Sequence, residues 1–134
     1  MALASRLARL HTGILSVVEQ HAPSEAAVEA PFHGVSARSA LQLAHARGVV
    51  LAALGILGVQ VFEYSPATIK KAVTGNGRAE KEQVEAMVSR LVAGGGGSAG
   101  RSDIADAIAA ALCHLFGIAH AEALGRTRDA RTRC

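Results

Sequence analysis

Three acidic side chains stand where this largely apolar sequence would be able to hold a metal ion. Glu29 ends the short apolar run 26–28, and Asp103 and Asp106 open an alanine-rich stretch that follows Ser102. Carboxylates are natural ligands of Mg²⁺, and a pair of such ions activates water and stabilises the leaving oxygen of a phosphodiester. If the three acids converge in space, they form a cluster that holds divalent metal.

The position of each acid indicates whether a structural explanation competes with a role in a metal site. Asp103 and Asp106 lie three apart, so on a helix they share one face with Cβ atoms about 5–6 Å apart. Asp103 also has a simpler explanation, because an acid in the first turn offsets the helix dipole by about 0.3–1 kcal/mol. Asp106 lies beyond the reach of that effect. Glu29 is either a solvated strand-end residue or a site residue at the carboxyl end of a strand, where open α/β sheets bind their ligands.

Hydrophobic periodicity and structure-breaking residues predict the helices and strands that must position these acids. Successive strand, helix and strand patterns predict a parallel strand pair with a right-handed crossover. The middle helix of this unit is apolar on several faces, so we expect a partner subunit to cover one of them. The glycine-rich stretch 94–100 predicts a linker. The predicted helices are 2–21, 37–55, 66–73, 80–93 and 102–119, and the predicted strands are 25–30 and 59–62.

Composition limits the class of protein. The 134 residues suit one domain, and half are apolar but only 3% aromatic, which favours closely packed helices. The formal charge of +3 is compatible with a polyanionic partner. Two cysteines are too few for a disulfide framework, and Cys113 is expected to be a small buried apolar residue. No uninterrupted apolar run reaches the roughly 18 residues of a membrane span, and no secretion signal opens the chain, so a cytoplasmic protein without membrane contact is predicted.

Four stretches, in order, resemble the RuvC-type Holliday junction resolvases. They are residues 28–32, 39–49, 61–84 and 103–109. The first ends in an aromatic residue three positions after its acid, and the last carries both aspartates. The resemblance implies an α/β fold of the ribonuclease-H-like type over residues 1–120, with a parallel strand pair and about five packed helices. Residues 121–134 are then a basic, disordered tail.

The resemblance also implies roles for individual residues. Glu29, Asp103 and Asp106 match catalytic acids that bind Mg²⁺, two ions per subunit. Lys70 and Lys81 match lysines near the scissile phosphate, where ammonium groups stabilise transition-state charge. The implied DNA-binding residues are Phe32, Arg38, Lys70, Lys71 and Lys81.

Each of these DNA contacts has an alternative. Phe32 either stacks on junction bases, as its family counterpart does, or is simply buried. Arg38 and Arg47 either contact phosphate or belong to a solvated helix face. The lysines, taken without the resemblance, fit a face of alternating solvated charges.

The implied function is a structure-specific endodeoxyribonuclease that resolves Holliday junctions by symmetric metal-dependent nicking in recombination and DNA repair. It would act as a homodimer with RuvA and RuvB. One departure is notable: no acid and no Asp-Pro-Gly precede Leu3, where the family has strands that carry a catalytic Asp. We therefore expect a resolvase shortened at its front edge. The alternatives are a catalytically impaired junction-binding or dimer-forming remnant, and a generic α/β interaction module.

Overall fold

The computed structural model describes residues 1–30, 36–92 and 102–132, with side chains up to Leu124 in the last helix. Phe32, the predicted linker 94–100 and the side chains of the arginine-rich tail lie outside the described part. The chain divides into two compact units, Met1–Glu63 and Tyr64–Cys134, which are described separately.

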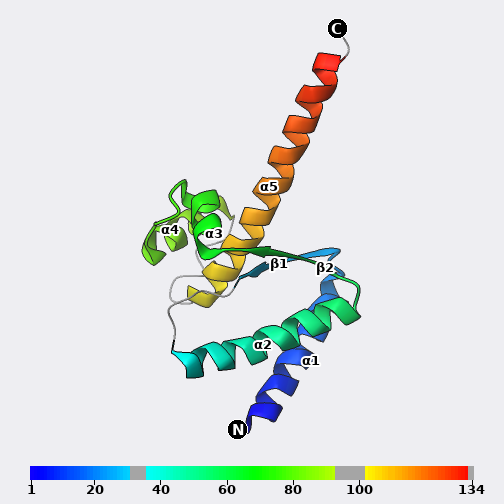
Figure 1. The fold of residues 1–134 in the computed structure, drawn as a ribbon, viewed down its shortest axis with the longest axis vertical. Helices are drawn as coiled ribbons and strands as arrows, with labels where there is room; N and C mark the ends of the chain where they lie inside the picture. Colours follow the sequence, from blue (N-terminus) through cyan, green and yellow to red (C-terminus); the bar gives the residue numbers. More distant parts are fainter. Residues whose placement is uncertain (31–35, 93–101, 133–134) are drawn as a thin grey trace. The chain divides into compact units, whose positions relative to one another are not determined.

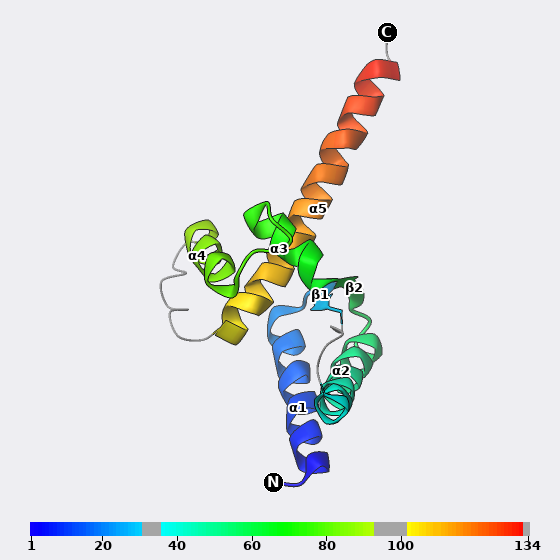
Figure 2. The same cartoon turned by 60° about the vertical axis from the view of Figure 1, so that its left-hand side comes forward.

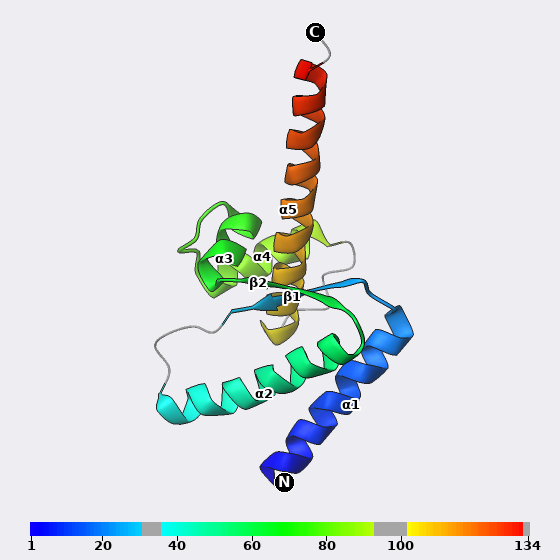
Figure 3. The ribbon, with the colours of Figure 1, turned by 45° about the vertical axis from the view of Figure 1, so that its right-hand side comes forward.

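The first unit contains the predicted strand, helix and strand (Figure 1). Helix α1 (Leu3–His21) precedes strand β1 (Glu25–Glu29), helix α2 (Ala37–Ile56) and strand β2 (Gln60–Tyr64). The two strands pair in parallel, and the order of the sheet is β1-β2. Helices α1 and α2 pack against each other, as Figures 2 and 3 show. The predicted parallel pair is therefore confirmed.

The second strand begins one residue later than predicted and ends at Tyr64. Gly58 adopts a left-handed conformation with φ of 72°, which turns the chain out of α2. The Gln60 amide then donates to the Ser24 carbonyl over 3.0 Å, which sets the register of β2 beside β1. Val59, predicted to be in the strand, is buried and lies between that turn and the strand.

The first unit buries few side chains. Among its described residues, the buried apolar ones are Ala53, Leu54 and Val59, and α1 contributes none. Large apolar side chains on α2 are exposed, with Leu41 at 59% and Leu43 at 61%. The apolar faces predicted for α2 therefore exist, and in the single chain one of them faces solvent.

In its described residues, the second unit consists of three helices with a shared core. Helices α3 (Pro66–Thr74) and α4 (Lys81–Leu91) pack on each other and on α5 (Ser102–Thr132). Small side chains on α5 allow this close approach of the helices. The buried residues are Ile69, Val73, Ala79, Val84, Val88, Ala105, Ala109, Ala110, Cys113 and His114.

Helix α5 is longer than predicted. It continues to Thr132 rather than ending near Ala119. Residues 121–124 are Ala-Glu-Ala-Leu, which are good helix formers, and no proline interrupts them. The end of the apolar pattern is therefore not the end of the helix.

Two helices have the length and composition of a membrane span. They are Ala37–Ile56, with mean hydropathy 1.4, and Ser102–Leu124, with mean hydropathy 1.6. The expectation from the sequence concerned uninterrupted apolar runs, whereas these helices reach the length with polar residues among the apolar ones. Core helices of water-soluble proteins have the same properties, so these two helices assign no location.

Candidate active site

The two predicted aspartates lie together at the start of α5. Asp103 is in its first turn, where its charge offsets the helix dipole, and Asp106 is one turn further on. Both side chains are exposed, whereas the neighbouring Ala105 is buried against the second unit's core. The two carboxylates thus remain open to solvent at the start of the helix, while Ala105 and other small side chains further along the helix are buried.

Lys81 joins this acidic face from α4. Its Nζ lies 3.3 Å from Oδ2 of Asp106, and the two side chains are 50% and 47% exposed. A half-exposed pair of this kind adds at most about 1 kcal/mol to stability. Its importance is positional, because it places an ammonium group beside a carboxylate at a surface that solutes can reach.

The start of α4 fixes the position of Lys81. Glu80 is the N-cap residue, and its amide donates to Oε1 of Gln83 over 2.9 Å in a capping box. The turn before it is also hydrogen-bonded: the Arg78 amide donates to Oδ1 of Asn76 over 2.9 Å. Gly77 packs so closely that a Cβ there would lie 3.2 Å from the Ala67 carbonyl oxygen. Specific contacts thus hold this turn.

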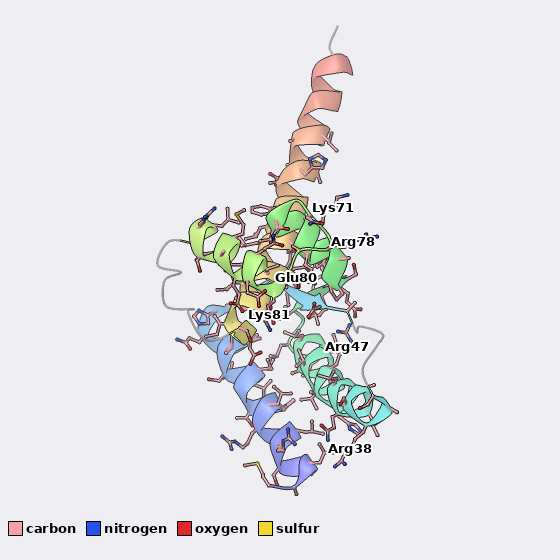
Figure 4. The ribbon with its side chains drawn as sticks, turned by 90° about the vertical axis from the view of Figure 1, so that its left-hand side faces the viewer. Arg38, Arg47, Lys71, Arg78, Glu80 and Lys81 are labelled. Carbon is pink, nitrogen blue, oxygen red and sulfur yellow. The ribbon has the colours of Figure 1, made fainter. Side chains whose placement is uncertain are left out.

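Helix α3 carries the other two predicted lysines. Ser65 caps its start by accepting from the Thr68 amide over 3.1 Å, and Gly75 ends it in a left-handed conformation. Lys70 is half-buried and Lys71 is exposed near the end of the helix. Figure 4 labels Lys71, Arg78 and Lys81, all of which belong to the second unit.

Glu29, the acid of the first unit, is exposed at the end of β1. Its carbonyl oxygen accepts a hydrogen bond of 2.7 Å from Nη1 of Arg47. The other terminal nitrogen of Arg47 lies 2.7 Å from Oε2 of Glu63 on β2. Arg47, which is labelled in Figure 4, therefore connects α2 to both strands. Of the two roles considered for it, phosphate contact and solvated helix face, neither describes these contacts.

A polar pair not foreseen from the sequence lies beside the core of the second unit. The Tyr64 hydroxyl and Nδ1 of His114 are 2.6 Å apart, and only 7% of His114 is exposed. His114 follows the buried Ala110 by four residues on the same helix, and this spacing indicates that its side chain turns inward. Cys113 is buried as predicted, and burial raises the pKa of its thiol.

The structure brings some of the predicted site residues together. Lys81 and Asp106 meet, with Asp103 one turn away on α5. Within residues 1–30, 36–92 and 102–132, no three His, Cys, Asp or Glu side chains gather as a metal-binding group. Glu29 belongs to the other unit, so its convergence with the aspartates stays a prediction. Arg38 is exposed in the first turn of α2.

Two carboxylates on one exposed face suit Mg²⁺. This ion retains several waters and is usually bound by one or two carboxylates together with substrate phosphates. Asp103 and Asp106 offer such a donor pair, and the adjacent ammonium of Lys81 is suited to an anionic substrate. The chemistry supported by this face is metal-assisted hydrolysis at a phosphate.

Comparison with known proteins places this geometry in context. A family model described as "Crossover junction endodeoxyribonuclease RuvC" matches residues 1–114. A protein of that name from Zymomonas mobilis is 46% identical over 131 residues, which are 98% of this chain and 76% of the relative. Another, from Anaeromyxobacter dehalogenans, is 49% identical over 113 residues, 84% of this chain. The chain spans 60% of the length of that second relative.

A solved structure agrees with these matches. The structure of T. thermophilus RuvC in complex with Holliday junction substrate superposes with a TM-score of 0.80 at 36% sequence identity. The match covers 88% of this chain and 71% of that one.

Proposed function

Because the chain belongs to the RuvC family of crossover junction endodeoxyribonucleases, we propose that it cuts Holliday junctions by metal-dependent hydrolysis. The observation that carries this proposal is the face of α5, where Asp106 pairs with Lys81 over 3.3 Å and Asp103 lies one turn away. An acid pair beside a cation suits a site that holds both a divalent ion and a phosphate. The T. thermophilus RuvC structure that superposes on this chain is a complex with Holliday junction substrate. This supports the same class of DNA as the substrate of this chain.

In the proposed site, Glu29, Asp103 and Asp106 hold Mg²⁺, two ions per subunit. When bound, the ions make water nucleophilic and stabilise the leaving oxygen. Lys70 and Lys81 contribute positive charge where negative charge develops on the phosphate. Lys71, Arg38 and Phe32 would contact DNA outside the reacting phosphate. The exposure of Lys71 and Arg38 fits that role.

The proposal extends to assembly and location. A four-way junction presents two strands to be cut, so symmetric nicking requires two sites, which a homodimer supplies. The exposed apolar residues of α2 fit a partner subunit. We further propose that residues 1–120 form the nuclease domain and 121–134 a basic tail. The protein would work with RuvA and RuvB in the cytoplasm, in recombination and repair.

The test is nicking of an end-labelled four-way junction by the purified chain, with Mg²⁺ and with EDTA. A gel-shift assay in Ca²⁺ measures binding beside it. The proposal predicts paired, symmetrically placed nicks in Mg²⁺, none in EDTA, and none in a linear duplex of the same sequence. Junction binding without nicks would instead support a catalytically impaired remnant. Neither binding nor nicking would support a generic interaction module.

A further inference from the structure

Arg47 makes two short contacts, one with the strand that carries Glu29 and one with the strand paired to it. Its Nη1 donates to the Glu29 carbonyl oxygen over 2.7 Å, and its Nη2 lies 2.7 Å from Oε2 of Glu63. The three residues come from α2, β1 and β2, and all lie within the first unit. A planar guanidinium with several N–H donors is suited to bridging two acceptors in fixed directions.

The burial of Arg47 makes these contacts consequential. Its side chain is 18% exposed, whereas that of Glu63 is 49% exposed. A charge-assisted hydrogen bond that is partly withdrawn from water is shorter and stronger than a neutral one. Because the charge of Arg47 is already neutralised by Glu63, the side chain is poorly suited to a phosphate.

The backbone contact determines what Arg47 does for the site. Glu29 is the last residue of β1, where strand pairing stops. A fixed carbonyl restricts the backbone of its own residue, and therefore the direction in which the Glu29 side chain leaves the chain. Outer residues that orient a metal ligand in this way typically affect metal affinity or activity by about 10–100-fold.

We propose that Arg47 is a positioning residue: by bridging the Glu29 carbonyl and Glu63, it holds the end of β1 so that Glu29 is oriented to bind metal. This inference rests on the proposed function, in which Glu29 is a metal ligand. Glu63 acts in turn on Arg47, because its carboxylate fixes the second arm of the guanidinium.

The experiment compares Arg47→Ala, Arg47→Lys and Glu63→Gln with the matched control Arg9→Ala. Arg9 is an exposed arginine on α1 of the same unit, so its removal changes the charge equally. Three quantities are measured on the full chain: the single-turnover nicking rate against Mg²⁺ concentration, the junction Kd in Ca²⁺, and hydrogen–deuterium exchange of residues 25–30.

For Arg47→Ala we expect nicking about 10–100-fold slower than in Arg9→Ala, with half-maximal rate at a higher Mg²⁺ concentration. The junction Kd should stay within about 2-fold, and exchange of residues 25–30 should accelerate. Arg47→Lys should restore part of the rate, because it keeps one cationic donor. If Arg47→Ala fails to fold, as judged by circular dichroism, Arg47→Lys and Glu63→Gln provide the same comparison.

Two results would overturn the proposal. Nicking at the rate of Arg9→Ala, at every Mg²⁺ concentration, would show that the bridge does not position the acid. A weaker junction Kd with a salt dependence reduced by about one phosphate contact would assign Arg47 to DNA binding instead. If the parent chain does not nick, the proposed function fails on its own. Exchange of residues 25–30 then decides separately whether Arg47 anchors the strand.

Discussion

The two units position their acids by different means. In the second unit, α3, α4 and α5 bury a set of apolar side chains among themselves, and the aspartates stand on the outer face of that assembly. In the first unit, the described residues bury only Ala53, Leu54 and Val59 as apolar core. Its acid, Glu29, is instead held through a charged bridge from Arg47.

The difference shows two ways to hold a catalytic side chain. A packed helix positions its exposed residues by its own rigidity, so the identity of any one neighbour matters little. The end of a short strand in a thin core depends on a few directional contacts. Chemistry on the second unit should therefore tolerate changes at surface residues outside the proposed site, whereas Glu29 should be sensitive to the loss of one arginine.

The largest effect is expected when an acid of the second unit is neutralised. Asp106→Asn removes a charge from the proposed metal site and the ionic partner of Lys81. Nicking should fall more than about 100-fold, beyond the range of residues that act on a metal only through others. Junction binding should remain within about 2-fold. The matched control is Glu122→Gln, an exposed acid further along α5, which should nick like the parent. Equal nicking by Asp106→Asn and the parent would remove Asp106 from the mechanism.

The next prediction tests the packing difference itself. Val88 on α4 is fully buried in the second unit, whereas Val17 on α1 is 53% exposed in the first. Val88→Ala should lower the free energy of unfolding by about 2 kcal/mol, because it removes two buried carbons and leaves a cavity. Val17→Ala should change it by less than about 0.5 kcal/mol. Urea unfolding of both variants measures this. A large loss for Val17→Ala would mean that α1 is covered by a partner in solution.

Local features of the fold were predictable from sequence. Ser65 and Pro66 marked the start of α3 correctly, because an N-cap hydroxyl and a proline at the first helical position act within one turn. The parallel strand pair followed from the order of the elements. The match to T. thermophilus RuvC at a TM-score of 0.80 confirms the ribonuclease-H-like fold class. The far end of α5 was missed because no breaker marks it.

Contacts between distant residues were beyond sequence reasoning. Residue type and resemblance indicate the acids, whereas the pairing of Lys81 with Asp106 depends on the packing of α4 on α5. The bridge made by Arg47 depends on where two strands and a helix meet, which no spacing encodes. The roles of the predicted site residues, and the convergence of Glu29 with the aspartates, stay predictions.

A smaller effect is expected when the polar pair Tyr64 and His114, beside the core of the second unit, is disrupted. Tyr64→Phe removes the hydroxyl that lies 2.6 Å from Nδ1 of His114. The unfolding free energy should fall by about 1 kcal/mol, the usual value of one buried hydrogen bond. A double-mutant cycle with His114→Ala isolates the pairwise contribution, since each residue also has other neighbours. A coupling energy near zero would mean that the apolar core alone orients α5.

The smallest effect concerns the pH dependence of stability, which tests whether water is excluded from the core of the second unit. Burial raises the pKa of the Cys113 thiol above its ordinary value, so folding favours the neutral form. In the unfolded chain the thiol ionises from about pH 8.5. The stability that Cys113 contributes is therefore complete below that pH and is lost as pH rises through the folded-state pKa. Urea unfolding of the parent and of Cys113→Ala, at pH 7 and pH 9.5, measures this contribution as a difference. The parent's advantage over the variant should shrink at the higher pH. A difference that is independent of pH would mean that water reaches Cys113. The core of the second unit would then exclude water less well than the packing of α3, α4 and α5 implies, and its contrast with the small core of the first unit would be weaker.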